Sequence, residues 1–332
     1  MLSKEEIRAQ SEAAYKQWAP QWREHAKINS KFPQQSFTDF ENIGIGKAVL
    51  CVAMGQSMEK EINVIKAYQG NVDIICCDKA LGILLDHDII PTYCLVCDAN
   101  VSYEKYMHPW KDKLSDIILI SNICANPKWI ANGNWKNKYF FVVKDVLQSE
   151  KEFCAISGCP ETNVVPAGTN VSNSLVILLT QSDNEGRRNY FGYDKILLIG
   201  FDYSWPLNGH YYAFDPDGGG KHNYMRHGYM YDGKGTMVCS SNNLIFSGRW
   251  LTDYVNAFAL PVVQCTKETV LVLNSSGNLS EQMQYSYKPE DADRVRDKIK
   301  LKRILDRQLK SITKEVEELA WDHNNAYLSS VS

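Results

Sequence analysis

A short turn, Gly55-Gln56-Ser57, separates an apolar run at 48–54 from a helical pattern that begins by residue 59. Glycine allows a ligand to approach the backbone closely, and Ser57 is placed to cap the following helix. Unpaired amides and the dipole at the start of a helix favour an anion such as phosphate. The spacing matches neither the Walker loop nor the dinucleotide-binding fingerprint, so an ordinary strand–turn–helix stays the alternative interpretation.

Two carboxylates follow other apolar, strand-like runs. Asp98 comes after 93–97, and Asp202 comes after 195–199. Open parallel sheets bind ligands beyond the carboxyl ends of their strands. Carboxylates at that edge can hold a metal–phosphate complex or a sugar hydroxyl, or can act as a base. If the reaction needs Mg²⁺, Asp98 and Asp202 are the predicted metal ligands, although each also suits a plain turn cap.

Two further groups could take part in the chemistry. Gly168-Thr169-Asn170 precedes a helical pattern and offers amides and hydrogen-bonding side chains, although Thr or Asn would also serve as an ordinary N-cap there. His210 lies in a Gly-rich stretch, with His222 and His227 further along. A histidine near a strand-end aspartate suits general acid–base work at neutral pH. The three histidines lack zinc-ligand spacing.

The elements that must position these residues alternate between strand-like runs and helical patterns. This alternation predicts an α/β fold, a Rossmann-like, doubly wound and mostly parallel sheet over 47–280. Strands are expected at 48–54, 72–77, 93–97, 117–120, 139–143 and 195–199.

A helix over 3–28 is expected to form an N-terminal appendage at 1–46. Its apolar stripe is assigned to Ala14, Trp18 and Trp22, and Pro20 is expected to kink or split it.

Two segments differ from the alternating pattern. Residues 203–248 are rich in Gly, Tyr, His and Asp with little periodicity, which is typical of a functional loop or lid. Residues 289–328 predict a long C-terminal helix, whose heptad-spaced apolar residues lie within 289–321. That helix can pair with a second copy of the chain or pack on its own domain.

Composition narrows the class of protein. The 332 residues carry a net charge of −3, which gives no bulk electrostatic reason to bind nucleic acid or an anionic membrane. No apolar run approaches the ~20 residues of a membrane-spanning helix, and the first residues lack a signal-peptide core. Many of the ten cysteines lie in apolar runs, as reduced buried thiols do. We therefore expect a cytoplasmic protein that binds neither nucleic acid nor membrane.

The order of the motifs resembles one Rossmann-like family, which includes the 6-hydroxymethylpterin diphosphokinases (MptE-like) and the motility accessory factor (Maf) flagellin glycosyltransferases. Met54-Gly55-Gln56-Ser57-Met58-Glu59 looks like its Gly-Pro-Ser-Leu-Glu opening. The next motifs of the family follow in the same order, as Asp78-Lys79-Ala80-Leu81, Ile90-Pro91-Thr92-Tyr93 and Val96-Cys97-Asp98. The later motifs of the family resemble three further features of this sequence, which are Gly168-Thr169-Asn170-Val171, the strand-like run 196–202 and His210. Bacterial sialyltransferases that use CMP-sialic acid are similar more distantly.

The resemblance implies a nucleotide-dependent transferase. The leading hypothesis is a glycosyltransferase-like enzyme that uses a nucleotide-activated sugar such as a CMP-nonulosonate. Asp202 and His210 would position or deprotonate the acceptor, a small molecule or a glycan. The residues implied in nucleotide binding are Gly55, Gln56, Ser57, Asp78, Asp98, Gly168, Thr169 and Asn170.

Two alternatives stay open. One is a 6-hydroxymethylpterin diphosphokinase-like pyrophosphokinase that uses ATP and Mg²⁺ at the same sheet edge. The other is a non-catalytic Rossmann-like module that assembles into a homo-oligomer through 289–321.

Overall fold

The computed structural model of the chain describes residues 4–180, 191–207, 211–214, 227–231, 235–266 and 269–284. Met1–Ser286 groups as one compact unit. The helix predicted over 289–328 lies outside the described residues, as do His210 and His222.

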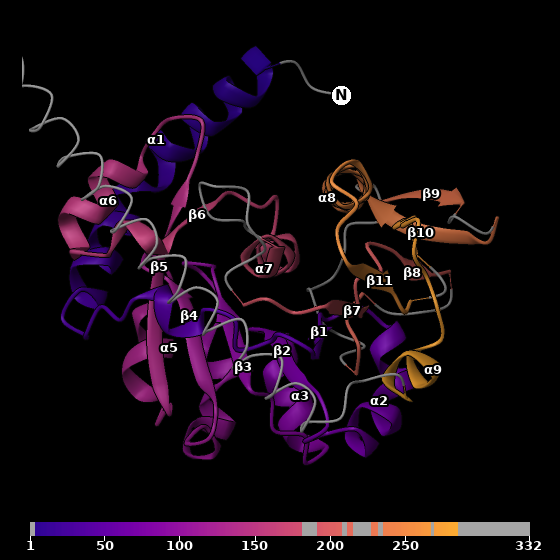
Figure 1. Ribbon diagram of the computed structural model, residues 1–332. Coiled ribbons are helices and arrows are strands. Elements are labelled where there is room, and N and C mark those ends of the chain that lie inside the picture. Colours follow the sequence, from indigo (N-terminus) through magenta and orange to yellow (C-terminus); the bar gives the residue numbers. More distant parts are fainter. Residues whose placement is uncertain are drawn as a thin grey trace, which may run out of the picture. The chain divides into compact units, whose positions relative to one another are not determined.

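An eight-stranded sheet forms the centre of this unit, in the order β11-β7-β1-β2-β3-β4-β5-β6 (Figure 1). Each neighbouring pair in it runs parallel. The predicted doubly wound, mostly parallel sheet is therefore confirmed. The strands are β1 Ala48–Val52, β2 Asp73–Cys77, β3 Tyr93–Val96, β4 Ile118–Asn122, β5 Asn137–Lys144, β6 Val164–Pro166, β7 Lys195–Ile199 and β11 Val262–Gln264.

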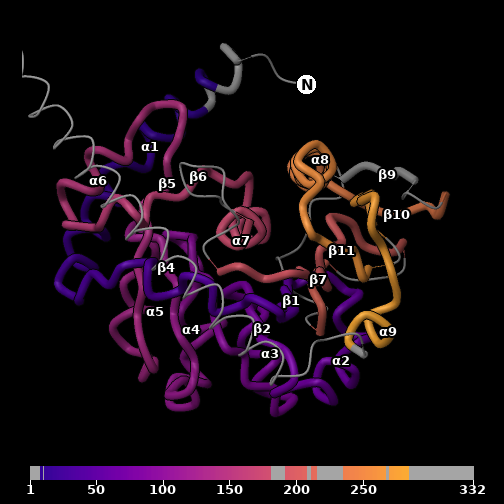
Figure 2. Tube along the Cα trace, in the orientation of Figure 1, coloured from indigo at the N-terminus to yellow at the C-terminus, as the bar shows by residue number. Residues whose placement is uncertain are grey.

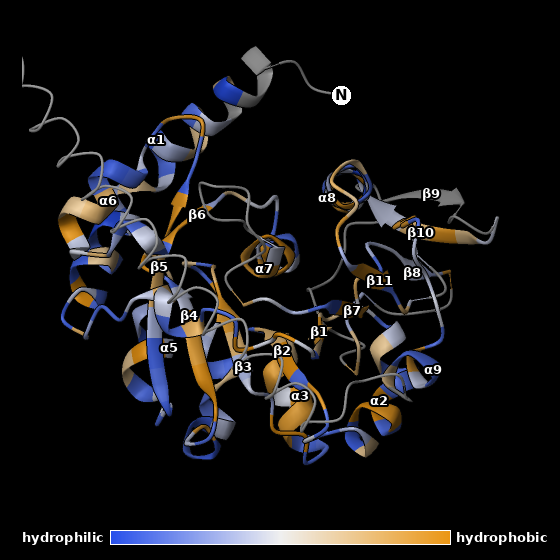
Figure 3. Cartoon of the chain, viewed as in Figure 1, coloured by the Kyte–Doolittle hydropathy of each residue, from blue (hydrophilic) through white to orange (hydrophobic). Residues whose placement is uncertain are grey.

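Both faces of the sheet are buried, which explains why the strands read as continuous apolar runs (Figure 3). Side chains alternate between the two faces along each strand. In β1, Leu50 and Val52 join one hydrophobic cluster, whereas Val49 and Cys51 join the other. All ten cysteines are among the described residues, and none of them forms a disulfide.

Helices cover each face. The longer ones on one face are α1 Lys4–Asn29, α2 Ser57–Ala67, α3 Ala80–Asp86, α5 Pro127–Asn132 and α6 Glu150–Ser157. The other face is covered by α7 Val171–Thr180 and α8 Asn242–Ala257 (Figure 1). The short elements are α4 Tyr103–Tyr106, α9 Leu279–Gln284, η1 Phe37–Phe40, η2 His108–Lys113 and η3 Glu161–Asn163.

The strand order reverses between β1 and β7. From β1 the chain adds strands in one direction as far as β6, and then returns to place β7 on the opposite side of β1 (Figure 2). The crevice outside the carboxyl ends of two strands at such a switch point is where doubly wound sheets bind ligands. This crevice lies between the turn that follows β1 and the turn that follows β7.

The N-terminal helix differs from the prediction in two ways. It runs from Lys4 to Asn29 without being split at the exposed Pro20. Its inward stripe includes Tyr15, Ala19 and Trp22, while Ala14 and Trp18 are exposed. Trp22 was assigned correctly, but the other two inward positions are each one residue later than predicted, because α1 packs on α5 and α6, which the local pattern cannot indicate.

The region 203–248 is only partly the loop that was predicted. A three-stranded antiparallel sheet, ordered β8-β10-β9, forms from Trp205–Pro206, Met237–Ser241 and His227–Tyr231. Ser241 then caps α8, because its hydroxyl accepts the Leu244 N–H at 3.4 Å. The strands escaped prediction because they are short and β8 contains a proline.

In the described part of the chain, no helix is long and apolar enough to cross a membrane.

Gly200 at the end of β7 provides a test of this arrangement. Its φ is +74°, and a Cβ there would lie 2.1 Å from the Ala53 carbonyl oxygen. We expect Gly200→Ala to lower the free energy of unfolding by about 2–4 kcal/mol, from left-handed strain plus overpacking. The control is Gly158→Ala, because Gly158 has a φ of +69° with open space around it and should cost only about 1–2 kcal/mol. Equal losses in urea unfolding would contradict the close approach.

Candidate functional site

The backbones that follow β1 and β7 are joined at the switch point. Ala53 N–H donates to the Ile199 carbonyl at 2.9 Å, and Gly55 N–H donates to the Gly200 carbonyl at 2.8 Å. A Cβ on Gly55 would lie 2.4 Å from the Gly200 oxygen and 2.6 Å from the Asp202 carboxyl carbon. Glycine is needed at 55 because the neighbouring turn occupies the space of a side chain.

The side chain of Asp202, which follows β7, binds the first residue of helix α2. Its carboxylate, on a residue that is 3% exposed, accepts the Ser57 N–H at 2.7 Å and the Ser57 hydroxyl at 2.6 Å. Ser57 is thus the first residue of α2 rather than its cap, and Gln56 at the cap position makes no side-chain cap bond. The anion that this helix terminus favours is the protein's own carboxylate. The N–H groups of Gly55 and Ser57, predicted to hold phosphate, are therefore already hydrogen-bonded.

A cavity of about 110 Å³ opens where these turns meet. It brings together three predicted site residues, Gly55, Asn170 and Asp202. Its lining includes an aromatic wall of Phe201, Tyr203, Trp205, Tyr211 and Tyr212. A second cavity, of about 230 Å³, shares Asp202 and is lined also by Gln56, Ser57 and Lys60. Asp202 is thus common to both cavities.

The Gly168–Asn170 turn is held mainly by bonds within the protein. Asn170 Oδ1 accepts the Asn173 N–H at 2.9 Å, so Asn170 caps α7. The buried Asn173 side chain donates to Thr169 Oγ1 at 2.5 Å and accepts the Tyr203 hydroxyl at 2.5 Å. The N-cap interpretation of this turn is correct for Asn170. Only Asn170 of the three also lines the cavity.

Lys79 was not selected from the sequence, but it contacts Tyr212, a residue that lines the first cavity. Its ammonium donates to the Tyr212 hydroxyl at 2.8 Å and lies 4.9 Å and 5.6 Å from the ring centres of Tyr212 and Tyr106. Burial lowers the pKa of Lys79. Tyr212 and Asp78 raise the pKa by more than burial lowers it, so the net pKa is above its usual value. A permanently charged cation therefore stands beside the cavity. Its signal was its place directly after Asp78 at a strand end.

The segment that carries Tyr212 is attached to the sheet edge. Ala213 N–H donates to the Met54 carbonyl at 3.0 Å, and Phe214 N–H donates to Glu59 Oε1 at 2.5 Å. The Phe214 ring lies 4.9 Å from His87. This described part of the predicted lid is therefore docked over the turns that follow β1 and β2.

Asp78 follows β2 and is 3% exposed. One carboxylate oxygen, Oδ1, accepts the Lys79 N–H at 2.7 Å, whereas the buried Oδ2 has no hydrogen-bond partner. Burial raises the pKa of Asp78 to about 6, against the lowering by Lys79, and Asp98 raises it further. An orphaned buried carboxylate oxygen is costly and requires an explanation.

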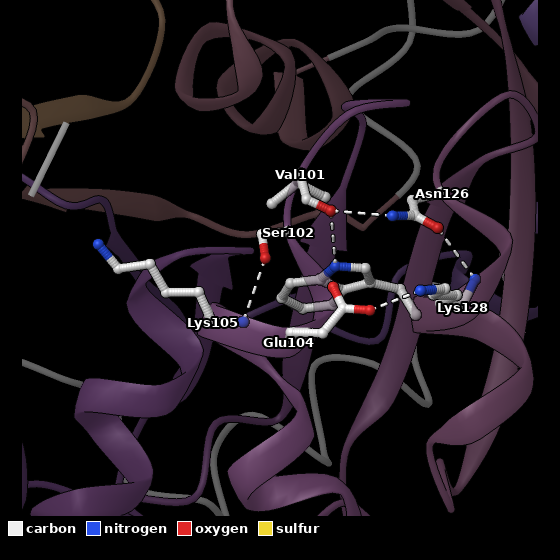
Figure 4. Close-up of polar contacts among 7 residues, drawn as sticks. Val101, Ser102, Glu104, Lys105, Asn126 and Lys128 are labelled. Atoms are coloured by element: carbon white, nitrogen blue, oxygen red, sulfur yellow. Dashed lines mark hydrogen bonds and ion pairs between the residues drawn. The ribbon is translucent and has the colours of Figure 1, made fainter. Parts of the chain in front are cut away.

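Asp98 is exposed and its Oδ1 accepts the Asn100 N–H at 2.8 Å. Its loop is anchored to α5 by Asn126, whose N–H donates to the Asp98 carbonyl at 3.3 Å and whose side chain donates to the Val101 carbonyl at 3.0 Å (Figure 4). Figure 4 also shows Ser102 bonded to the Lys105 backbone N–H, at the start of α4.

Asp98 and Asp202 are not brought together as a metal pair. Two strands, β1 and β2, separate β3 from β7, which places their ends about 14 Å apart at the usual strand spacing. This strand order does not support one Mg²⁺ held by both carboxylates, and local sequence patterns carry no information on strand order. Within the described residues, no three His, Cys, Asp or Glu side chains are grouped for a metal ion. His210 lies outside the described residues, so its predicted role stays a prediction.

These observations define a doubly wound α/β protein with a cavity at its switch point. The sequence pattern of the 6-hydroxymethylpterin diphosphokinase MptE-like family matches residues 22–208, more than half of the chain. The chain belongs to this MptE-like family, in agreement with the order of its motifs.

Among solved structures, the chain is similar to the Maf glycosyltransferase from Magnetospirillum magneticum AMB-1, with a TM-score of 0.51 and 15% identity. The match covers 82% of this chain but 41% of that protein, and at this identity it shows the fold alone. Comparison with curated protein sequences gave no match.

The buried Asp78 predicts a pH-dependent stability. Because its pKa of about 6 exceeds the ordinary 3.8, the folded chain holds a proton that the unfolded chain releases between pH 4 and 6. Stability from this group is therefore fully present below pH 4 and lost as the pH rises through 6, by up to about 3 kcal/mol. Urea unfolding should show wild type losing this amount relative to Asp78→Asn between pH 4 and pH 7. A constant difference would contradict the raised pKa.

Proposed function

We propose that this protein is a nucleotide-dependent transferase whose nucleotide binds at the switch point between β1 and β7. The observation that carries the proposal is the cavity that combines Asp202, the aromatic wall of Tyr211 and Tyr212, and the Lys79 ammonium at its side. Aromatic faces stack on nucleobases and sugars, and a lysine ammonium is a common phosphate ligand.

The donor we propose is a nucleotide-activated sugar, and a CMP-nonulosonate is the first candidate to test. The fold shared with a Maf glycosyltransferase over 82% of this chain supports a sugar donor. The aromatic wall is compatible with this donor, since rings stack on both the base and the sugar. Asp202 lines both cavities, which supports its assignment as the residue that orients an acceptor hydroxyl. Its bonds to Ser57 fix the carboxylate in position and reduce the cost of reorientation.

A second candidate function is pyrophosphate transfer from ATP. The family match supports it, and the exposed Asp98 is the observation in its favour. Mg²⁺ is commonly held by one or two carboxylates together with substrate phosphates, and Asp98 fits that part. The ion would neutralise charge on the transferred group. Lys79 would bind phosphate in this reaction as well, so the residue cannot discriminate between the two candidates.

Ligand-dependent thermal unfolding separates these functions. We expect CMP to stabilise the protein, and a ligand at about 100 times its Kd adds roughly 2.7 kcal/mol. The titration compares CMP, UDP, GDP and ATP, each with and without Mg²⁺. Stabilisation by ATP with Mg²⁺ alone would replace the sugar donor by the pyrophosphokinase, and no response to any nucleotide would overturn nucleotide binding altogether.

Lys79→Met tests the proposed phosphate contact. A hydrogen bond to a charged group contributes about 1.5–3 kcal/mol, so the variant should bind the stabilising nucleotide about 10- to 100-fold more weakly. The matched control is Lys66→Met, because Lys66 is an exposed lysine near the end of α2 whose ammonium pairs with Asp88 at 3.0 Å. Unchanged affinity in Lys79→Met by titration calorimetry would remove Lys79 from the site.

A further inference from the structure

The unpartnered oxygen of Asp78 is the least explained polar atom near the site. Asp78 is 3% exposed, and its Oδ1 is fixed by the Lys79 N–H at 2.7 Å. The bond to Oδ1 holds the carboxylate group in one orientation, and the other oxygen, Oδ2, has no hydrogen-bond partner. Folding has therefore placed a carboxylate oxygen where it is dehydrated and unsatisfied, at a measurable cost in stability. A ligand that donates one hydrogen bond to Oδ2 would remove that cost.

The position of Asp78 indicates which ligand group this is. In the register of β1 with β2, Val52 is opposite Cys76, so Asp78 stands two residues further on, beside the turn before Gly55. An acidic residue about 20 positions after such a glycine turn, at the end of the second strand, hydrogen-bonds a ribose 2′-hydroxyl in dinucleotide-binding folds. The spacing from Gly55 to Asp78 is similar, although the three-glycine fingerprint is absent here.

We propose that Asp78 is the ribose-recognising residue of this site, accepting the 2′-hydroxyl on Oδ2 and making the protein selective for ribonucleotides over 2′-deoxyribonucleotides. This inference rests on the proposed nucleotide binding and specifies its ligand class.

A hydroxyl group fits Oδ2 better than a metal ion. The oxygen exposes less than 1 Å², and Mg²⁺ gives up its water reluctantly and usually retains several water ligands. A hydroxyl loses fewer hydrogen bonds when it enters a dry site and supplies the single donor that Oδ2 lacks.

Entry of the ribose requires a neighbouring side chain to move. Lys79 is adjacent to Asp78 in sequence and half-buried, and its ammonium is held by Tyr212. A nucleotide phosphate competes with the Tyr212 hydroxyl for this ammonium. Because Asp78 and Lys79 are consecutive residues at the end of β2, we expect the binding of phosphate to Lys79 to favour the binding of ribose to Asp78.

The experiment compares matched ribo- and 2′-deoxyribonucleotides by titration calorimetry at pH 7. The probes are CMP with dCMP and ATP with dATP, used with the full chain. We expect at least about a tenfold weaker Kd for the deoxy member of the pair that binds, because a site built for a hydroxyl rejects the analogue without it. In Asp78→Ala the preference should fall to less than about twofold.

Asp78→Asn provides a second variant if Asp78→Ala fails to fold, and it too should lose most of the preference. The control is Asp73→Asn, at the opposite end of β2, where the carboxylate accepts the Tyr193 hydroxyl at 2.7 Å; it should keep the ribose preference. Equal binding of ribo- and deoxyribonucleotides by the wild type would overturn this inference and leave nucleotide binding intact. Failure of every probe to bind would overturn the proposed function itself. A preference that persists in both Asp78 variants would assign the 2′-hydroxyl to another residue.

Discussion

The pairing of the Asp202 carboxylate with the backbone and hydroxyl of Ser57 is the interaction on which the site depends. It joins the end of β7 to the first turn of α2, at the place where the strand order reverses. Because the carboxylate is buried, its desolvation is costly, and these charge-assisted bonds and the helix dipole help to offset that cost. Gly55 and Gly200 permit the close approach, since a Cβ on either would meet the neighbouring backbone. Asp202, which lines both cavities, is held by this junction.

The same junction moves the candidate phosphate site away from the helix terminus. With that terminus occupied by Asp202, the positive charge beside the cavity comes from Lys79, which is positioned by Tyr212. The stretch 211–214 therefore contributes an aromatic wall and also orients the cation. Asp78, the neighbouring residue, has a desolvation cost, because its buried Oδ2 has no hydrogen-bond partner. Such costs are typical of residues that are retained for binding rather than for stability.

Local pattern was sufficient for much of the fold. The run 195–199 became β7 with those bounds, because a strand buried on both faces needs a continuous apolar sequence. Short strands with three residues, such as β6 and β11, lack enough periodicity to be recognised. The motif order also identified the family before any geometry was known. The turn at 55–57 was located correctly between its strand and its helix, whereas its hydrogen-bonding partners were not, since Asp202 lies 145 residues away from Ser57.

The sequence by itself therefore determined the class of fold, its family and the strand ends at which site residues stand, because these depend on local periodicity and on motif order. Only the tertiary structure decided which strand ends are neighbours. It separated Asp98 from Asp202 by two strands, gave the α2 terminus to Asp202, and brought Lys79 to Tyr212. The physical reason is that strand order and side-chain pairing are set by long-range packing of the two sheet faces, which leaves no signature in any single segment.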